Sequence, residues 1–129
     1  MAEEKNFENK VKAFLKNECG AFLVKYWGGG KFTSAGIPDL LVCINGYFMG
    51  VELKASDGKP SKLQCEKLMR IIRSNGIGMV LYPKDFEAFK EFCRRIACGE
   101  IPVNLYNTKK YDGFLWDWWF LYDDIRIMG

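Results

Sequence analysis

The chain has 129 residues, of which 49% are hydrophobic and 16% aromatic, so it is long enough to bury one core and too apolar to be disordered. Its formal net charge is +3, an excess too small to indicate a nucleic-acid-binding protein by composition alone. The absence of histidine excludes Ser-His and Cys-His catalytic pairs and H-E-x-x-H zinc sites. Hydrolytic chemistry in this protein would therefore depend on carboxylates, lysine and a metal ion.

The N-terminus, "MAEEKNFENK", lacks the basic flank and apolar block of a secretory signal, and no apolar run is long enough to span a bilayer. We therefore expect a soluble intracellular protein without a membrane partner, located in the cytoplasm of a bacterial or phage-infected cell. The five cysteines are odd in number and show no C-x-x-C spacing. They are expected to be reduced core residues rather than disulfide partners or zinc ligands.

The first predicted element is an amphipathic helix that ends near Gly20, because apolar residues recur at helical spacing at Phe7, Val11, Phe14 and Leu15. The apolar run 21–27 predicts a strand, and the glycines at 28–30 predict that a loop follows it.

Two further strands are predicted at 38–44 and 47–55, joined by Asn45-Gly46, a dipeptide typical of tight hairpin turns. Ser61 and Gln64 have the spacing of a capping box, which predicts that a second helix begins there and ends at Gly76. The apolar run 77–83 predicts a buried strand.

A third helix is predicted between a cap at Asp85 and a stop at Gly99. From Glu100 onward the sequence is rich in aromatic residues but fits neither a helical nor an alternating pattern. We expect a single α/β domain with a mixed central sheet flanked by helices, in the order α-β-β-β-α-β-α. Residues 1–99 would form the core, and residues 100–129 an extension packed on the same domain or at a dimer interface.

The predicted hairpin brings charged residues together in an apolar setting. Glu52 and Lys54 lie two positions apart and so share one face of their strand, and the turn brings Asp39 alongside them. Mg²⁺ prefers oxygen ligands, commonly one or two carboxylates with water and substrate phosphate. Two carboxylates and an ammonium therefore indicate metal-assisted hydrolysis of a phosphodiester.

These residues resemble a known family. Pro38-Asp39 followed by Glu52-x-Lys54 on a hairpin between two helices resembles the PD-(D/E)xK nuclease superfamily, with its restriction-endonuclease-like fold. The glycine before "PDL" and the Ser61-x-x-Gln64 pattern resemble the virus-type replication-repair nuclease group, VRR-NUC. The resemblance extends from the first helix to the third and leaves the segment from Glu100 uncovered.

The resemblance implies a role for each matching residue. Asp39 and Glu52 would bind Mg²⁺ or Mn²⁺ together with the backbone carbonyl of Leu53, and Lys54 would be the catalytic lysine. Gln64 would lie at the edge of the site, and Glu8 on the first helix would complete the acidic cluster. Some members of this group are Holliday junction resolvases that act as homodimers.

Each of these residues also has a structural interpretation. Asp39 could be a turn residue after proline, and Glu52 with Lys54 could be the solvated face of an edge strand. Gln64 is explained by the capping box alone, and Glu4 or Glu18 could take the place assigned to Glu8.

Residues outside the motif are candidates for binding DNA: Lys25, Lys31, Ser34, Lys59 and Lys62. The tail aromatics at 116, 118, 119, 120 and 122 are expected in the core or at a dimer contact rather than stacked on bases, because aspartates lie among them.

The sequence thus predicts a Mg²⁺- or Mn²⁺-dependent DNA endonuclease, homodimeric and acting on branched or structured DNA in the manner of a Holliday junction resolvase. Three alternatives remain open: a nuclease that cuts flaps, ends or duplex DNA in replication, repair or restriction; a ribonuclease; and a non-catalytic nucleic-acid-binding module built on a nuclease fold.

Overall fold

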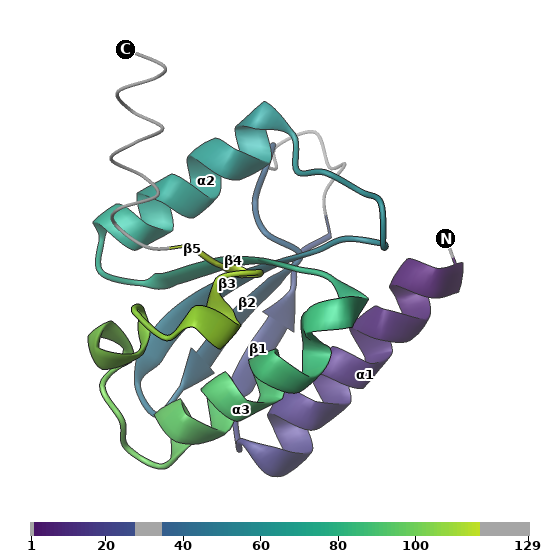
Figure 1. Ribbon diagram of the computed structural model, residues 1–129. Coiled ribbons are helices and arrows are strands. Elements are labelled where there is room, and N and C mark those ends of the chain that lie inside the picture. The colour runs from purple at the N-terminus through teal and green to yellow at the C-terminus, as the bar shows by residue number, and fades with distance from the viewer. Residues whose placement is uncertain (1, 28–34, 117–129) are drawn as a thin grey trace.

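The computed structural model describes residues 2–27 and 35–116 (Figure 1). Its helices and strands follow in the order α1 (Ala2–Glu18), β1 (Phe22–Lys25), β2 (Leu40–Ile44), β3 (Tyr47–Leu53), α2 (Lys62–Arg73), β4 (Ile77–Leu81), α3 (Phe86–Ala97) and β5 (Leu115–Trp116). Three short 3-10 helices lie at Pro83–Asp85, Pro102–Leu105 and Lys109–Tyr111.

The strands form one five-stranded sheet in the order β1-β2-β3-β4-β5. The first three strands are antiparallel neighbours, β4 is parallel to β3, and β5 is antiparallel to β4. The β2–β3 turn has positive φ at both Asn45 (49°) and Gly46 (85°), as the Asn-Gly dipeptide predicts. This mixed sheet flanked by helices confirms the predicted fold class.

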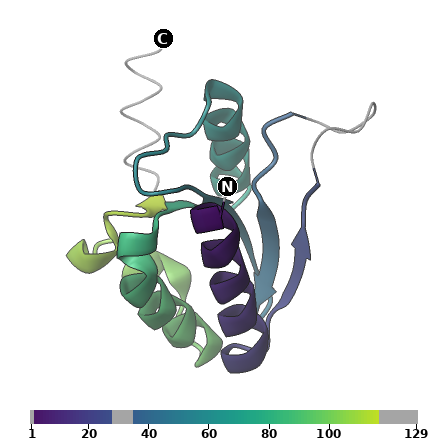
Figure 2. The same ribbon diagram turned by 90° about the vertical axis from the view of Figure 1, so that its right-hand side faces the viewer.

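Helices cover both faces of the sheet. In Figure 1, α2 lies on one face and α1 and α3 lie together on the other, and the turned view in Figure 2 keeps α1 beside α3. Most of the buried apolar side chains lie between the sheet and the α1–α3 layer, among them Val11, Leu15, Leu40, Val51, Phe89 and Phe92.

On the α2 face, two strand glycines allow the helix to approach closely. A Cβ at Gly50 would lie 2.6 Å from Cδ1 of Ile71, and a Cβ at Gly78 would lie 3.0 Å from Cδ1 of Ile72. A side chain at either position would require the facing isoleucine side chain of α2 to move.

Several local predictions were wrong. α2 ends at Arg73, and the left-handed residue after it is Asn75 (φ 71°) rather than Gly76. Asp85 makes no side-chain capping bond to α3, because the 3-10 turn that ends at Asp85 runs directly into the helix. Cys43 and Cys98 are exposed rather than in the core.

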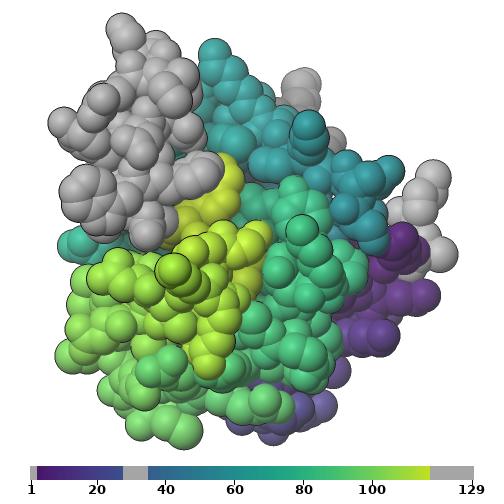
Figure 3. All heavy atoms as spheres, viewed as in Figure 1, coloured from purple at the N-terminus to yellow at the C-terminus, as the bar shows by residue number. Residues whose placement is uncertain are grey.

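The segment after α3 packs against the rest of the chain. Leu105, Tyr111, Phe114 and Leu115 are buried in the same core as the residues before them, and β5 adds an edge strand that sequence periodicity did not predict. In Figure 3 the chain from α3 to β5, green to yellow, forms one continuous surface. The predicted aromatic contacts at 118, 119, 120 and 122 lie outside the described residues, and the division of the chain at residue 99 stays a prediction.

No helix in the described ranges is long and apolar enough to cross a membrane.

Candidate active site

Asp39 and Glu52 lie next to each other at the open end of the β2–β3 hairpin. Leu40 pairs with Val51 at the last registered position, so one further step along the hairpin sets Asp39 opposite Glu52. The backbone N–H of Leu53 donates to Oδ2 of Asp39 over 2.8 Å. The hairpin thus brings together the two carboxylates that the sequence motif paired.

The chain before Asp39 is held against the start of α2 by a glycine. Gly36 has φ +83°, and a Cβ there would lie 2.6 Å from both the backbone C and O of Leu63. No side chain fits between the two backbones, so the glycine allows this segment to pack on the first turn of α2. Pro38, the next residue but one, is buried.

Glu52 is 1% exposed, and its Oε2 has no hydrogen-bond partner in the described part of the chain. Burial, followed by the hydrogen bond to Asp39 and the negative charge of Asp39, raises the pKa of Glu52 to about 9. The Lys54 ammonium lowers this pKa and the Glu4 carboxylate raises it further. Without a cation, therefore, Glu52 is protonated at neutral pH.

Lys54 lies just beyond the end of β3, where its backbone N–H donates to the carbonyl of Leu81 over 3.0 Å. Its side chain is half-buried, and its charge acts on Glu52. The structure therefore places Asp39, Glu52 and Lys54 at one end of the sheet.

Glu8 also reaches this cluster, through a lysine. Lys25, the last residue of β1, donates to Oε1 of Glu8 over 2.7 Å, and its Nζ lies 3.7 Å from Oδ1 of Asp39. Glu8 is 5% exposed, and its Oε2 lies 3.2 Å from the ammonium of Lys12 and 3.6 Å from that of Lys5. Burial raises the pKa of Glu8, but the hydrogen bonds from Lys25 and Lys12 outweigh it and hold the pKa below its usual value.

The two alternatives to Glu8 are placed differently. Glu18 pairs with Arg94 at the opposite end of α1, over 2.9 Å. Glu4 acts on Glu52 only through its charge. Of the three glutamates, Glu8 is the one that shares a lysine with Asp39.

Lys25 was predicted to contact DNA, and the structure places it beside Glu8 and Asp39 in the acidic cluster, where a contact with DNA stays a prediction. The sequence indicates that Lys25 faces α1. It lies two residues after Leu23 in the same strand, so both side chains are on one face, and Leu23 packs on the core. The pairing partner on α1 could not be identified from spacing alone.

Gln64 is engaged in capping α2. Its Oε1 accepts from the backbone N–H of Ser61 over 2.8 Å, and Oγ of Ser61 accepts from the N–H of Gln64 over 3.2 Å. The capping box is confirmed, and a catalytic role for Gln64 stays a prediction.

Of the four other predicted DNA-binding residues, two lie in the described part of the chain. Lys59, before α2, and Lys62, its first residue, are exposed, whereas Lys31 and Ser34 lie outside the described residues. The loop after Lys54 is bonded to α1: Glu3 accepts from the backbone N–H of Ser56 over 3.0 Å and from its hydroxyl over 2.7 Å. This contact ties the segment after Lys54 to the first turn of α1.

The cluster can hold a divalent cation, judged by its donor atoms. Asp39 and Glu52 are adjacent, and the unpartnered, buried Oε2 of Glu52 is an oxygen with its lone pairs unused. Within residues 2–27 and 35–116, no group of three or more His, Cys, Asp or Glu side chains is arranged to bind a metal. The fit is therefore to a cation with two protein carboxylates and other oxygen ligands, as Mg²⁺ accepts.

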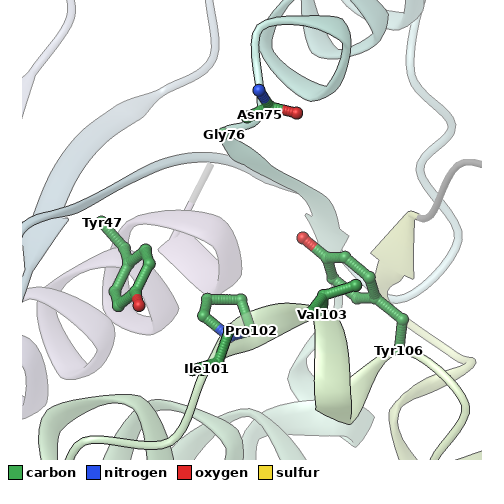
Figure 4. Close-up of a pocket in the computed structure, with 7 residues that line it drawn as sticks. All are labelled: Tyr47, Asn75, Gly76, Ile101, Pro102, Val103 and Tyr106. Carbon is green, nitrogen blue, oxygen red and sulfur yellow. The ribbon is translucent and has the colours of Figure 1, made fainter.

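A separate cleft of about 180 Å³ lies at the other end of β3, beside Tyr47 (Figure 4). Its lining carries no charged side chain and consists of Tyr47, Asn75, Gly76, Ile101, Pro102, Val103 and Tyr106. Without carboxylates or ammonium groups, it lacks the chemistry of the Asp39–Glu52 cluster.

No protein-family model matches this chain, and no curated protein matches it. Among solved structures, the chain is similar to the Holliday junction resolvase Hjc of the archaeal hyperthermophile Archaeoglobus fulgidus, with 19% identity and a TM-score of 0.45 over 61% of this chain and 69% of that one. It is also similar to a structure described as a VRR_NUC domain, with 25% identity and a TM-score of 0.46 over 65% of this chain and 94% of that one.

Proposed function

We propose that this protein is a metal-dependent DNA endonuclease that hydrolyses phosphodiester bonds in branched DNA, such as a four-way junction. The observation that carries the proposal is the Asp39–Glu52 pair, in which a buried carboxylate with an unpartnered oxygen lies against a second carboxylate. A buried pair of this kind is costly to ionise unless a cation compensates its charge. A protein gains from retaining such a pair when a metal ion binds there.

Asp39, Glu52 and the backbone carbonyl of Leu53 would hold the ion. A bound Mg²⁺ or Mn²⁺ supplies an activated water and a positive charge next to the phosphate. The N–H of Leu53 keeps Asp39 oriented toward Glu52. Glu52 is 1% exposed, and this burial strengthens the attraction between its ionised carboxylate and a bound cation.

Lys54 would supply a second function beside the pair. Its ammonium follows Glu52 by two residues, and its backbone is fixed to β4. From there it can orient the attacking water or stabilise the charge that develops on the phosphate in the transition state. Gln64, at the edge of the site, would contact the substrate only if it left the capping box.

We propose that the protein acts as a homodimer, joined through the part of the sheet that α2 leaves uncovered. Phe22 pairs with Cys43, and Cys43 pairs with Phe48, so these three side chains share the α2 face. Phe22, Val24 and Phe48 are 73%, 48% and 47% exposed. Contiguous exposed apolar side chains of this kind are typical of interaction surfaces. A second copy is the occupant that suits paired cuts in a four-way junction.

The experiment that tests the activity is cleavage of labelled four-way junction, flap, splayed-arm, single-stranded and linear duplex DNA, with a matched RNA junction, in Mg²⁺, Mn²⁺ and EDTA. We expect paired symmetric cuts in the DNA junction that require metal and are lost in Asp39→Asn. Cutting of flaps or duplex would instead favour a replication, repair or restriction nuclease. Metal-independent binding without any cutting would favour a binding module and contradict the proposal.

A further inference from the structure

Lys25 occupies a position between two carboxylates that the motif alone does not explain. Its Nζ lies 2.7 Å from Oε1 of Glu8 and 3.7 Å from Oδ1 of Asp39. The side chain is only 18% exposed, so it is held in place rather than free in solvent. One ammonium therefore bridges the helix glutamate and the motif aspartate.

The surroundings of Lys25 keep it positively charged. Carboxylate oxygens of both Glu8 and Asp39 pair with its Nζ, which favours the charged ammonium. The ring of Trp27 adds to this environment, since its centroid lies 5.5 Å from Nζ of Lys25. Lys25 is thus a fixed cation beside the proposed metal ligands.

Glu8, in contrast, has its charge already compensated. Three ammonium groups surround its carboxylate, those of Lys25, Lys12 and Lys5. A divalent ion that bound Glu8 directly would have to displace Lys25 and would be repelled by the other two lysines. This arrangement suits an anchor for Lys25 better than a metal ligand.

Building on the proposed function, we propose that Lys25 serves as the second cation of the site. Glu8 positions it, a single divalent ion binds at Asp39 and Glu52, and Lys25 contacts the substrate phosphate. In two-metal nucleases the two ions lie about 3.5–4 Å apart and together stabilise the attacking and leaving oxygens. An ammonium with an N–H free to turn to the phosphate can supply the charge of one of them, without the ability to activate water.

Metal binding tests this assignment without depending on activity. Titration calorimetry with Mn²⁺ should show one ion per chain in the wild type. Lys25→Met removes a neighbouring positive charge and should raise the affinity for that ion by about threefold to tenfold. Glu8→Gln should keep the one-ion stoichiometry and weaken affinity far less than Glu52→Gln. Two ions in the wild type, with one lost in Glu8→Gln, would make Glu8 a ligand and overturn the proposal.

DNA binding and cleavage provide the second test. Lys25→Met should lower the cleavage rate by about 10²- to 10³-fold while metal binding is retained, and Lys25→Arg should restore part of that rate. In Ca²⁺, DNA affinity can be measured separately from cleavage. There the magnitude of the slope of log affinity against log salt should decrease by about one in Lys25→Met. An unchanged slope with a wild-type rate would overturn the proposal.

Lys12→Met is the matched control, because Lys12 also pairs with Glu8 but no contact joins it to Asp39 in the described chain. It should keep the wild-type metal affinity and rate. Glu8 retains two lysine partners in Lys25→Met, so this variant should fold, and circular dichroism checks that it does.

A wild type that neither binds Mn²⁺ nor cuts DNA would refute the proposed function itself. If the wild type binds one ion and cuts DNA, and Lys25→Met has the same cleavage rate and salt slope as the wild type, only the role of Lys25 is refuted.

Discussion

At the scale of single residues, Glu52 couples the stability of the metal-free protein to pH. Its carboxyl has a reference pKa of 4.5 and a folded-state pKa of about 9, so between these values the folded protein holds one more proton than the unfolded chain. The stabilisation is complete below the lower value, falls as pH rises across this range, and levels off above the upper value.

We therefore expect the melting temperature of the metal-free wild type, relative to that of Glu52→Gln, to fall as pH rises from about 5 to about 9. Glutamine resembles the protonated carboxyl and cannot ionise, so the variant lacks this contribution to the pH dependence. Thermal melts in EDTA across this range measure the difference. Parallel curves for the two proteins would mean that Glu52 ionises normally in the folded state.

Lys54 is the residue whose charge should affect the cleavage rate far more than metal binding. Its ammonium acts on Glu52 only as a moderating charge, and its backbone bond to Leu81 survives truncation of the side chain. Lys54→Ala should lower the cleavage rate by about a hundredfold or more while Mn²⁺ still binds. Wild-type cutting by this variant, followed in a single-turnover assay, would remove Lys54 from the mechanism.

At the scale of elements, Gly36 fixes the position of the motif loop on α2. Gly36→Ala places a methyl group 2.6 Å from the Leu63 backbone and puts an L-residue at φ +83°, so we expect a destabilisation of about 3 kcal/mol. Denaturant unfolding measures it. Gly46→Ala is the matched control, because Gly46 has φ +85° with nothing within 4 Å of the added methyl, and should cost only about 1 kcal/mol. Equal costs for the two variants would show that the close approach is unimportant.

The capping box of α2 separates a structural role of Gln64 from a catalytic one. Ser61→Ala removes one of its two hydrogen bonds and should destabilise the protein by about 1 kcal/mol without slowing cleavage. Gln64→Ala removes the other bond and should destabilise it similarly. If Gln64 is structural only, both variants cut at the wild-type rate. A rate loss confined to Gln64→Ala would assign it a role at the site.

At the scale of the whole molecule, the exposed apolar surface of Phe22, Val24, Cys43 and Phe48 is where a second copy is expected. Phe48→Glu places a charge on this surface beside Cys43 and should convert a dimer to a monomer, because burying an unpaired carboxylate is costly. Light scattering after size-exclusion chromatography measures the mass. Val103→Glu, at a side chain 62% exposed in the separate cleft, should leave the dimer intact. A wild type that is monomeric at all concentrations would contradict the proposed interface.

The sequence alone determined the order of elements through β4 and α3, because periodic apolar residues, the Asn45-Gly46 turn and the capping box are local signals. It also paired Asp39 with Glu52, since a tight hairpin fixes which residues face each other. Only the tertiary structure revealed the packing of the segment after α3 and the placement of Lys25 between Glu8 and Asp39. Those contacts join residues distant in the chain, and they depend on how α1 and β5 pack on the sheet, which no local pattern specifies.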